Sequence, residues 1–292
     1  MNPVDFAKGS SRMITRHGTC RSLVPLTFAA FVILGSWASL PVSAGEPVKV
    51  AMLPIVERSI AFHGGEVFGG SRISLSICSR SGCFSIQACI DGALFDYVVE
   101  GEVRGKRRKV HWTNDPEARP AGQDGDLIEE WLDGTAIALD ATGRQSAQDF
   151  VSARVYFPFL PFRLADPSAW KQDLGLETWG ERRLHKVKVT FTPGSSTDAS
   201  DEYLYWFDPE TGRLEQLAYS FGEGERGGLR FRRGLDYRRV GGVLFFDQEN
   251  LGVDGGRVEV DVITPAYVTE AMKPISKVEH KDIRVEPLDP AH

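Results

Sequence analysis

Side chains that could perform catalysis are scattered along this sequence. No two of its six histidines lie four residues apart, and no H-E-x-x-H, G-x-S-x-G or Walker motif occurs. Gly222–Gly227 has the G-x-G-x-x-G spacing of a phosphate loop, but it separates two predicted strands instead of opening a helix. The sequence therefore predicts no enzyme, no metal site and no cofactor.

Individual polar residues have simpler interpretations than catalysis. His63 closes a predicted helix, where a histidine interacts favourably with the helix dipole. The acidic pairs Glu129-Glu130 and Asp201-Glu202 lie beside predicted strands and are interpreted as solvated faces. The basic cluster Arg104–Lys109 is interpreted as a solvated strand end, with docking to a phosphate-rich surface as the alternative.

An aromatic segment, Tyr156–Leu164, is the best candidate for a binding element. It places four aromatic residues around two prolines, namely Tyr156, Phe157, Phe159 and Phe162 around Pro158 and Pro161. Such a segment either belongs to the core that holds a helix against a sheet or lines a cavity for an apolar chain. Both interpretations require a sheet beside it.

The first 44 residues have the three parts of a secretory signal. Arg12, Arg16 and Arg21 precede the apolar run Leu23–Leu40, and Val42-Ser43-Ala44 forms a small-x-small cleavage site. An uncleaved membrane anchor is the alternative, and translation starts at either Met1 or Met13. We expect an exported protein, most simply periplasmic in a Gram-negative envelope, with secretion as the alternative.

Export permits a disulfide, and the alternation of side chains indicates which one. If Cys78 lies opposite Cys83 in a hairpin, the apolar residues of both strands fall on one face and these two cysteines on the other. A Cys78–Cys83 disulfide is therefore predicted. Cys89 is left over and could displace either partner. The spacing of the three lacks the paired form of a zinc site.

The first half of the chain predicts a helix followed by hairpins. The helix covers Pro47–His63 and ends at Gly64-Gly65. After the cysteine hairpin, five segments are predicted: strands Phe95–Val103 and Lys106–Thr113, an exposed loop Asn114–Asp126, and strands Leu127–Leu132 and Thr135–Leu139 joined by Asp133-Gly134. A second helix, Ser146–Phe157, ends at Pro158.

The second half returns to strands separated by glycine-rich turns. The predicted strands are Lys186–Phe191, Tyr203–Phe207, Leu214–Phe221, Leu229–Tyr237, Val243–Leu251 and Arg257–Tyr267. Tyr203–Phe207 is aromatic on both faces and is expected to be central. About a dozen antiparallel strands seldom stay flat, so the sheet should curl. The fold class is mainly β (α+β), one domain over residues 45–286, with a frayed tail at 287–292.

Several of these segments resemble an uncharacterised family of exported bacterial proteins. The resemblance covers roughly residues 55–252 and rests on Ile60–Gly65, on L-P-F-x-L-x-D at Leu160–Asp166, and on D-E-Y-x-x-W-F-D at Asp201–Asp208. That family is similar to outer-membrane lipoprotein carriers and lipoprotein-sorting proteins. The resemblance implies a half-barrel that holds acyl chains on its concave side. Here an N-terminal helix and a central aromatic helix would close it.

A half-barrel of this size has more concave area than two short helices can fill. We therefore expect a cavity between the sheet and Ser146–Leu164, lined by some of Phe157, Phe159, Leu160 and Phe162. Arg163 and Trp206 would supply polar contacts at its mouth.

The predicted function is a non-enzymatic carrier or binding protein for a lipid, an acyl chain or a lipidated partner. The alternative is a structural envelope scaffold with a solid core that acts by protein contacts. Residues 1–44 contain four Lys or Arg and one Asp, so 30 basic and 39 acidic residues remain, a net charge of −9. This balance argues against nucleic acid and anionic membrane as main partners.

The signal sequence gives a first test. We expect the exported protein to begin at Gly45, because the apolar run and the Val42-Ser43-Ala44 site favour cleavage. N-terminal sequencing of the exported form should read Gly-Glu-Pro. Recovery of the intact segment 23–40 would show that it is an anchor.

Overall fold

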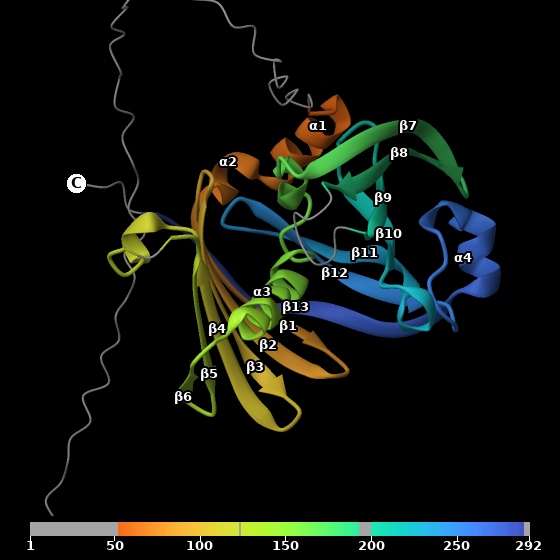
Figure 1. The fold of residues 1–292 in the computed structure, drawn as a ribbon. Coiled ribbons are helices and arrows are strands. Elements are labelled where there is room, and N and C mark those ends of the chain that lie inside the picture. The colour runs from red at the N-terminus through yellow and green to blue at the C-terminus, as the bar shows by residue number, and fades with distance from the viewer. Residues whose placement is uncertain (1–51, 123, 193–199, 289–292) are drawn as a thin grey trace, which may run out of the picture.

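The computed structural model describes residues 52–122, 124–192 and 200–288 (Figure 1). The predicted signal peptide and cleavage site lie outside the described residues, as do residues 47–51 of the predicted first helix and residues 289–292 of the predicted tail. Among the helices of this described part, none is long and apolar enough to cross a membrane.

One curved antiparallel sheet contains all thirteen strands of the described part, which confirms the predicted half-barrel. Every strand pair is antiparallel. The strands are β1 (Gly70–Ser79), β2 (Gly82–Asp91), β3 (Leu94–Val103), β4 (Lys106–Thr113), β5 (Leu127–Leu132), β6 (Thr135–Ile137), β7 (Ala169–Trp179), β8 (Arg182–Phe191), β9 (Glu202–Phe207), β10 (Leu214–Phe221), β11 (Gly228–Val240), β12 (Val243–Gly252) and β13 (Lys273–Pro287).

The strand order is that of two meanders joined at their inner ends. It runs β6-β5-β4-β3-β2-β1-β13-β12-β11-β10-β9-β8-β7, so the first and last strands pair in the middle. The chain leaves one edge at β6 and re-enters at β7 on the opposite edge. The segment that connects them, residues 138–168, crosses the concave side, and Figure 1 shows its helix within the curve of the sheet. We call it the crossing segment.

The cysteine hairpin has the predicted register. Cys78 lies opposite Cys83, Ile77 opposite Phe84 and Leu75 opposite Ile86. Cys78 and Cys83 form a disulfide, and the buried Cys89 stays outside it. The apolar residues of both strands belong to the core on the concave side. Side-chain alternation alone was enough to fix this register.

Both predicted helices exist with different bounds. α1 spans Pro54–His63 and begins later than predicted, because Leu53 is held extended by the proline that follows it and Pro54 suits the first helical position. α3 spans Ala141–Val155, five residues earlier than predicted at its start. There Asp140 caps the helix by accepting a hydrogen bond from the Gly143 amide at 2.7 Å.

Gly64 ends α1 at a φ of +96°, followed by the short helix α2 (Gly65–Phe68). A Cβ on Gly64 would lie 2.4 Å from the Gly242 carbonyl oxygen in the β11–β12 turn. A larger residue would therefore push the helix pair off the sheet.

The predicted strand Arg257–Tyr267 is wrong. Val260–Val262 form a 3-10 helix and Pro265–Ala271 form α4, whose first turn is capped when Thr264 Oγ1 accepts a hydrogen bond from the Tyr267 amide at 3.1 Å. The alternating valines of this segment suggested a strand, but Val260 and Ile263 pack together onto the convex side. Strands β7 and β13 were not predicted.

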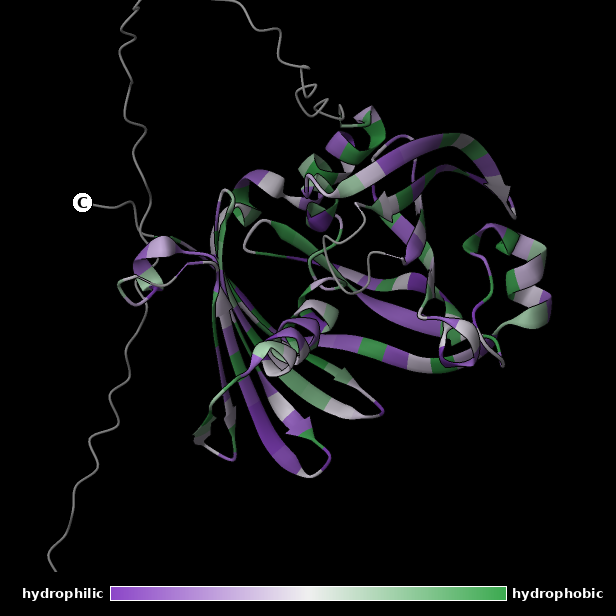
Figure 2. Ribbon diagram, viewed as in Figure 1, coloured by the Kyte–Doolittle hydropathy of each residue, from purple (hydrophilic) through white to green (hydrophobic). Residues whose placement is uncertain are grey.

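The sheet is covered differently on its two sides. The concave side carries two apolar clusters: one joins β1–β4 to α3 and Phe159, and the other joins β8–β10 to α1, Leu160 and Leu164. The convex side of β8–β12 is covered by α4, with Trp206 and Phe231 buried beneath it. Figure 2 shows hydrophobic and hydrophilic residues alternating along many strands. β9 is buried on both faces and is an inner strand between β10 and β8, although it lies third from one edge and not at the centre of the sheet.

The disulfide generates a stability prediction. Replacing both Cys78 and Cys83 by Ser should lower the free energy of unfolding by about 2 kcal/mol, because the bond closes a short loop in the unfolded chain. Urea melts of the oxidised parent and the variant measure this. Cys89→Ser is the control, and non-reducing peptide mapping should still find Cys78 linked to Cys83. A link from Cys89 to either residue would contradict the register.

Candidate functional site

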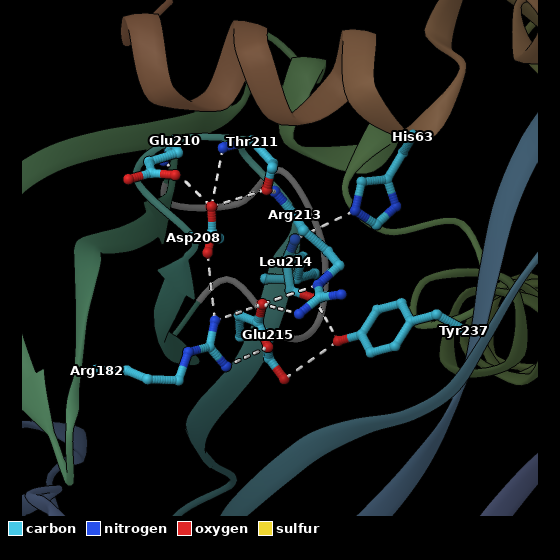
Figure 3. A network of polar contacts seen from close by, with 9 residues as sticks. All are labelled: His63, Arg182, Asp208, Glu210, Thr211, Arg213, Leu214, Glu215 and Tyr237. Carbon is cyan, nitrogen blue, oxygen red and sulfur yellow. Dashed lines mark hydrogen bonds and ion pairs between the residues drawn. The ribbon is translucent and has the colours of Figure 1, made fainter.

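The densest polar network lies around the β9–β10 turn, beneath α1 (Figure 3). Asp208 Oδ1 accepts hydrogen bonds from the backbone amides of Glu210 and Thr211, at 3.2 and 2.8 Å, and from the Thr211 hydroxyl at 2.8 Å. These contacts hold the pKa of Asp208 below its ordinary value, although burial opposes them. The carboxylate therefore fixes the turn.

The charged groups of this network neutralise one another. Arg182 lies between two carboxylates, 3.3 Å from Asp208 and 2.9 Å from Glu215, and Figure 3 shows it reaching both. Arg213 lies 2.7 Å from the same Glu215 oxygen. Tyr237 donates a hydrogen bond to the Leu214 carbonyl at 2.7 Å. The paired groups therefore anchor the strands around this turn.

His63 is a buried neutral residue and not the charged helix cap that the sequence suggested. It has no exposed surface, and its Nε2 accepts a hydrogen bond from the Leu214 amide at 3.2 Å. Burial lowers the pKa of His63 to about 3, and the positive charges of Arg239 and Arg213 contribute to the lowering. A helix end that is removed from water cannot hold a charged imidazole without a carboxylate partner.

The acidic pairs are not solvated throughout. Glu130 is buried and lies 2.9 Å from Arg108, and Asp201 is buried, where it accepts a hydrogen bond from the Gly222 amide. Only Glu129 keeps a substantial exposed fraction, at 47%, and it contacts His111 at 3.1 Å. Pairing across the sheet explains why these carboxylates could be buried.

A cavity of about 230 Å³ lies where the crossing segment meets the middle of the sheet. The C-terminal end of α3, with Phe157 and Pro158 after it, forms one wall, and strands β1, β2, β11 and β13 form the other. The lining residues are Ile77, Cys78, Ser79, Phe84, Ala153, Arg154, Phe157, Pro158, Arg232, Val278 and His280. Most of this lining is apolar, and none of these residues is acidic.

Two arginines of the lining lie against aromatic rings. The Arg232 guanidinium lies 3.6 Å from the centre of the Phe157 ring, and that of Arg154 lies 4.1 Å from the centre of the Phe84 ring. Arg232 also donates hydrogen bonds to Gln248 and to the Tyr219 hydroxyl, at 2.8 and 3.1 Å. Burial, with the charge of Arg108, lowers the pKa of Arg154 to about 10, so it remains charged at neutral pH.

His280 is the most deeply buried polar group of this cavity, with 4% of its surface exposed. Its backbone amide donates to Asp247 at 3.0 Å, but neither ring nitrogen has a hydrogen-bond partner among the described residues. Burial lowers the pKa of His280 to about 4, with the positive charges of Arg238 and Arg232 adding to the effect and Asp247 opposing it. The ring is therefore neutral at pH 7.

A second, larger cavity of about 510 Å³ lies near the other end of α3. Its lining includes Arg104, Lys106 and Arg108 of the basic cluster. Arg108 is paired with the buried Glu130, which neutralises the most enclosed charge of this group. The geometry favours a solvated strand end here over a built anion site.

The six residues predicted to bind a ligand are divided by the structure. Phe157 lines the smaller cavity, while Phe159, Leu160 and Phe162 are buried within the two concave clusters beside it. Arg163 contacts Asp166 at 3.6 Å. Trp206 has no exposed surface and packs on the convex side, where its indole N–H donates to Glu177. The structure therefore separates Trp206 from the cavity by the thickness of the sheet.

Sequence reasoning missed Arg154, Arg232 and His280. They come from α3, β11 and β13, three segments far apart in the chain. No motif joins them, because only the pairing of β13 with β1 brings the last strand beside the first. The one local signal was the alternation of apolar and polar residues around His280, which is typical of a strand.

Comparisons with known proteins give a family and a set of similar structures. A family model described as "Family of unknown function (DUF6503)" matches residues 127–280. No curated protein has a matching sequence.

Three solved structures are similar to the chain over 80% of its length. A LolA superfamily protein from Nitrosomonas europaea is 13% identical in sequence; the alignment includes 93% of that protein and has a TM-score of 0.41. A putative outer membrane lipoprotein-sorting protein domain from Vibrio parahaemolyticus is 12% identical, with 91% of that domain aligned and a TM-score of 0.34. A DUF1329 family protein from Desulfovibrio piger is 10% identical, with 92% of that protein aligned and a TM-score of 0.37.

The buried histidines predict a pH dependence of stability. In the unfolded chain a histidine binds a proton near pH 6.5, whereas folded His63 does so only near pH 3. The stability that neutral His63 gives the folded state is therefore complete above pH 6.5. It is lost progressively as the pH falls, at about 1.4 kcal/mol per pH unit for one site. His63→Gln, which keeps an acceptor for the Leu214 amide, should show a shallower decline between pH 6.5 and 4. Urea melts across this range measure it, and parallel curves for parent and variant would refute the assignment.

Proposed function

This chain belongs to the DUF6503 family, whose function is unknown, and we propose that it is a non-enzymatic binding or carrier protein for an apolar chain. The ligand is a lipid, a free acyl chain or the acyl chain of a lipidated partner. The protein acts after export, in the periplasm of a Gram-negative envelope.

The cavity between the crossing segment and the sheet carries this proposal. It is bounded by Ile77, Phe84 and Val278 of the sheet and by Phe157 and Pro158 of the crossing segment. Burying a ligand methylene against such a wall contributes about 0.8 kcal/mol. Affinity can therefore come from chain length alone.

The cavity volume limits what it holds. About 230 Å³ is below the roughly 300–1,000 Å³ of pockets for drug-sized ligands. The cavity as it stands suits a short chain or one end of a longer one. A longer chain requires the half-buried side chain of Phe157 to move, since Phe159 and Leu160 beside it are already packed within the cores.

The disulfide supports an oxidising compartment. Cys78 and Cys83 are bonded at the tip of the β1–β2 hairpin, and disulfides persist outside the reducing cytosol. The predicted signal sequence gives the same location independently.

A structural scaffold is the second candidate, and one observation favours it. Phe159, Leu160 and Leu164 are almost completely buried, so much of the concave side is filled by the protein itself. A scaffold would carry no ligand. Native mass spectrometry of the protein purified from the periplasm of a bacterial host distinguishes the two: a carrier shows an added lipid mass that organic extraction removes, whereas a scaffold shows the mass of the polypeptide alone.

Two neighbouring phenylalanines give a matched pair of variants. Phe157→Ala should weaken binding of a fluorescent fatty-acid probe several-fold and reduce stability only modestly, since Phe157 is half-buried and lines the cavity. Phe159→Ala should cost about 3–5 kcal/mol of stability, because Phe159 is fully buried against Phe68 and Tyr97. Probe titration and urea melts of both variants measure these effects. A parent protein that binds no probe would exclude the carrier.

A further inference from the structure

The cavity at the end of α3 is positively charged as well as apolar. Arg154 and Arg232 line it, and neither forms an ion pair with any carboxylate among the described residues. Most other arginines buried to a similar degree do, as Arg108 does with Glu130 and Arg238 with Asp247. Unpaired positive charge in a partly buried place is costly unless an anion compensates for it.

The nitrogen atoms of the lining are incompletely bonded within the protein. The Nε atoms of Arg154 and Arg232 are buried and have no protein acceptor, and the same holds for both ring nitrogens of His280. Buried polar atoms of native proteins almost always have a partner, so three such side chains around one cavity point to a ligand that supplies acceptor oxygens.

The acidic groups near His280 cannot serve as that partner. Asp247 is the nearest, and it accepts hydrogen bonds from the His280 amide and from Arg238. Asp247 precedes Gln248, whose side chain bonds Arg232 and the Phe157 carbonyl on the concave side. Since side chains alternate along a strand, Asp247 points to the convex side. His280 and Arg232 line the same cavity, and its lining contains no carboxylate.

We propose that the cavity binds an amphiphile with an anionic head group, held by Arg154, Arg232 and His280, and a short apolar chain lying against Phe84, Phe157 and Val278. This inference rests on the proposed function and specifies its ligand class. Carboxylate and phosphate-ester head groups share the required chemistry, because each offers several acceptor oxygens and a negative charge. A neutral chain would leave the Nε atoms of the two arginines and the ring nitrogens of His280 without acceptors.

The protonation state of His280 is coupled to the binding of an anion. Its ring is neutral in the free protein, with Arg232 and Arg238 disfavouring its charge and Asp247 favouring it. An anion beside the ring raises the affinity of the imidazole for a proton. A head group that stays ionised, such as a phosphate ester, therefore favours protonation of His280 when it binds.

The test compares ligands that differ only in head group. Octanoate, octyl phosphate and 1-octanol are titrated against a fluorescent fatty-acid probe bound to the full chain at pH 7. We expect both anions to displace the probe at concentrations at least tenfold lower than 1-octanol does. Equal potency of octanoate and 1-octanol would overturn the anionic head group while leaving the proposed carrier intact. Failure of all three to bind would overturn both proposals.

Adjacent arginines provide a matched control. Arg232→Met should remove most of the preference for octanoate over 1-octanol, measured as the ratio of the concentrations at which each displaces the probe. Arg233→Met changes the next residue of β11, which is exposed and paired with Glu249, and should keep the preference intact. Arg154→Met is a second variant should Arg232→Met fold poorly. An unchanged preference in both cavity variants refutes the assignment.

A free anion is distinguished by one further titration. Inorganic phosphate at the same concentration should displace the probe far less than octyl phosphate does, because it lacks the chain that packs on the aromatic wall. Equal displacement would show that the cavity binds small anions and not amphiphiles, which contradicts the proposal.

Discussion

The structure depends on one topological constraint: the chain must pass from β6 to β7 at opposite edges of a thirteen-strand sheet. It does so across the concave side, and this passage determines what that side contains. The crossing segment must therefore be apolar toward both halves of the sheet. Phe159 packs with the β1–β4 cluster, and Leu160, the next residue, packs with the β8–β10 cluster. The same segment thus forms the core and one wall of the candidate site.

The cavity lies where the crossing segment changes from a regular helix to an irregular chain. Up to Val155 the segment is a helix whose buried side chains meet the sheet at regular intervals. From Tyr156 it loses this regularity, with three prolines and one short 3-10 helix, Phe162–Ala165. The sheet below continues with its own repeat, so the two surfaces no longer match. Three basic side chains from α3, β11 and β13 enter the resulting space. The same few residues therefore determine the packing here and line the proposed binding cavity.

The sequence allowed accurate prediction wherever structure is determined locally. The cysteine register followed from alternation over sixteen residues, and Asp133-Gly134 identified a tight hairpin, in which both residues adopt positive φ. Prediction failed where contacts with segments distant in the sequence determine the local conformation. Val258 and Val260 alternate as in a strand, yet both pack in the cluster on the convex side of the sheet, and Val260 begins a 3-10 helix there. The basic residues that line the cavity could likewise not be predicted from the sequence, since His280 lies beside Ile77 only because β13 pairs with β1.

The pairing of β1 with β13 also has a consequence for how the molecule folds. Ser71 lies opposite Pro287, so the central seam of the sheet joins residues separated by almost the whole described chain. Each meander can form from near neighbours, but the seam carries a large loop-closure entropy and forms only after the last strand has been synthesised. Folding is therefore expected to be slow at this step, and a chain that lacks its last strand also lacks the central pair of strands. The arrangement delays completion of the native state until the whole polypeptide has been made.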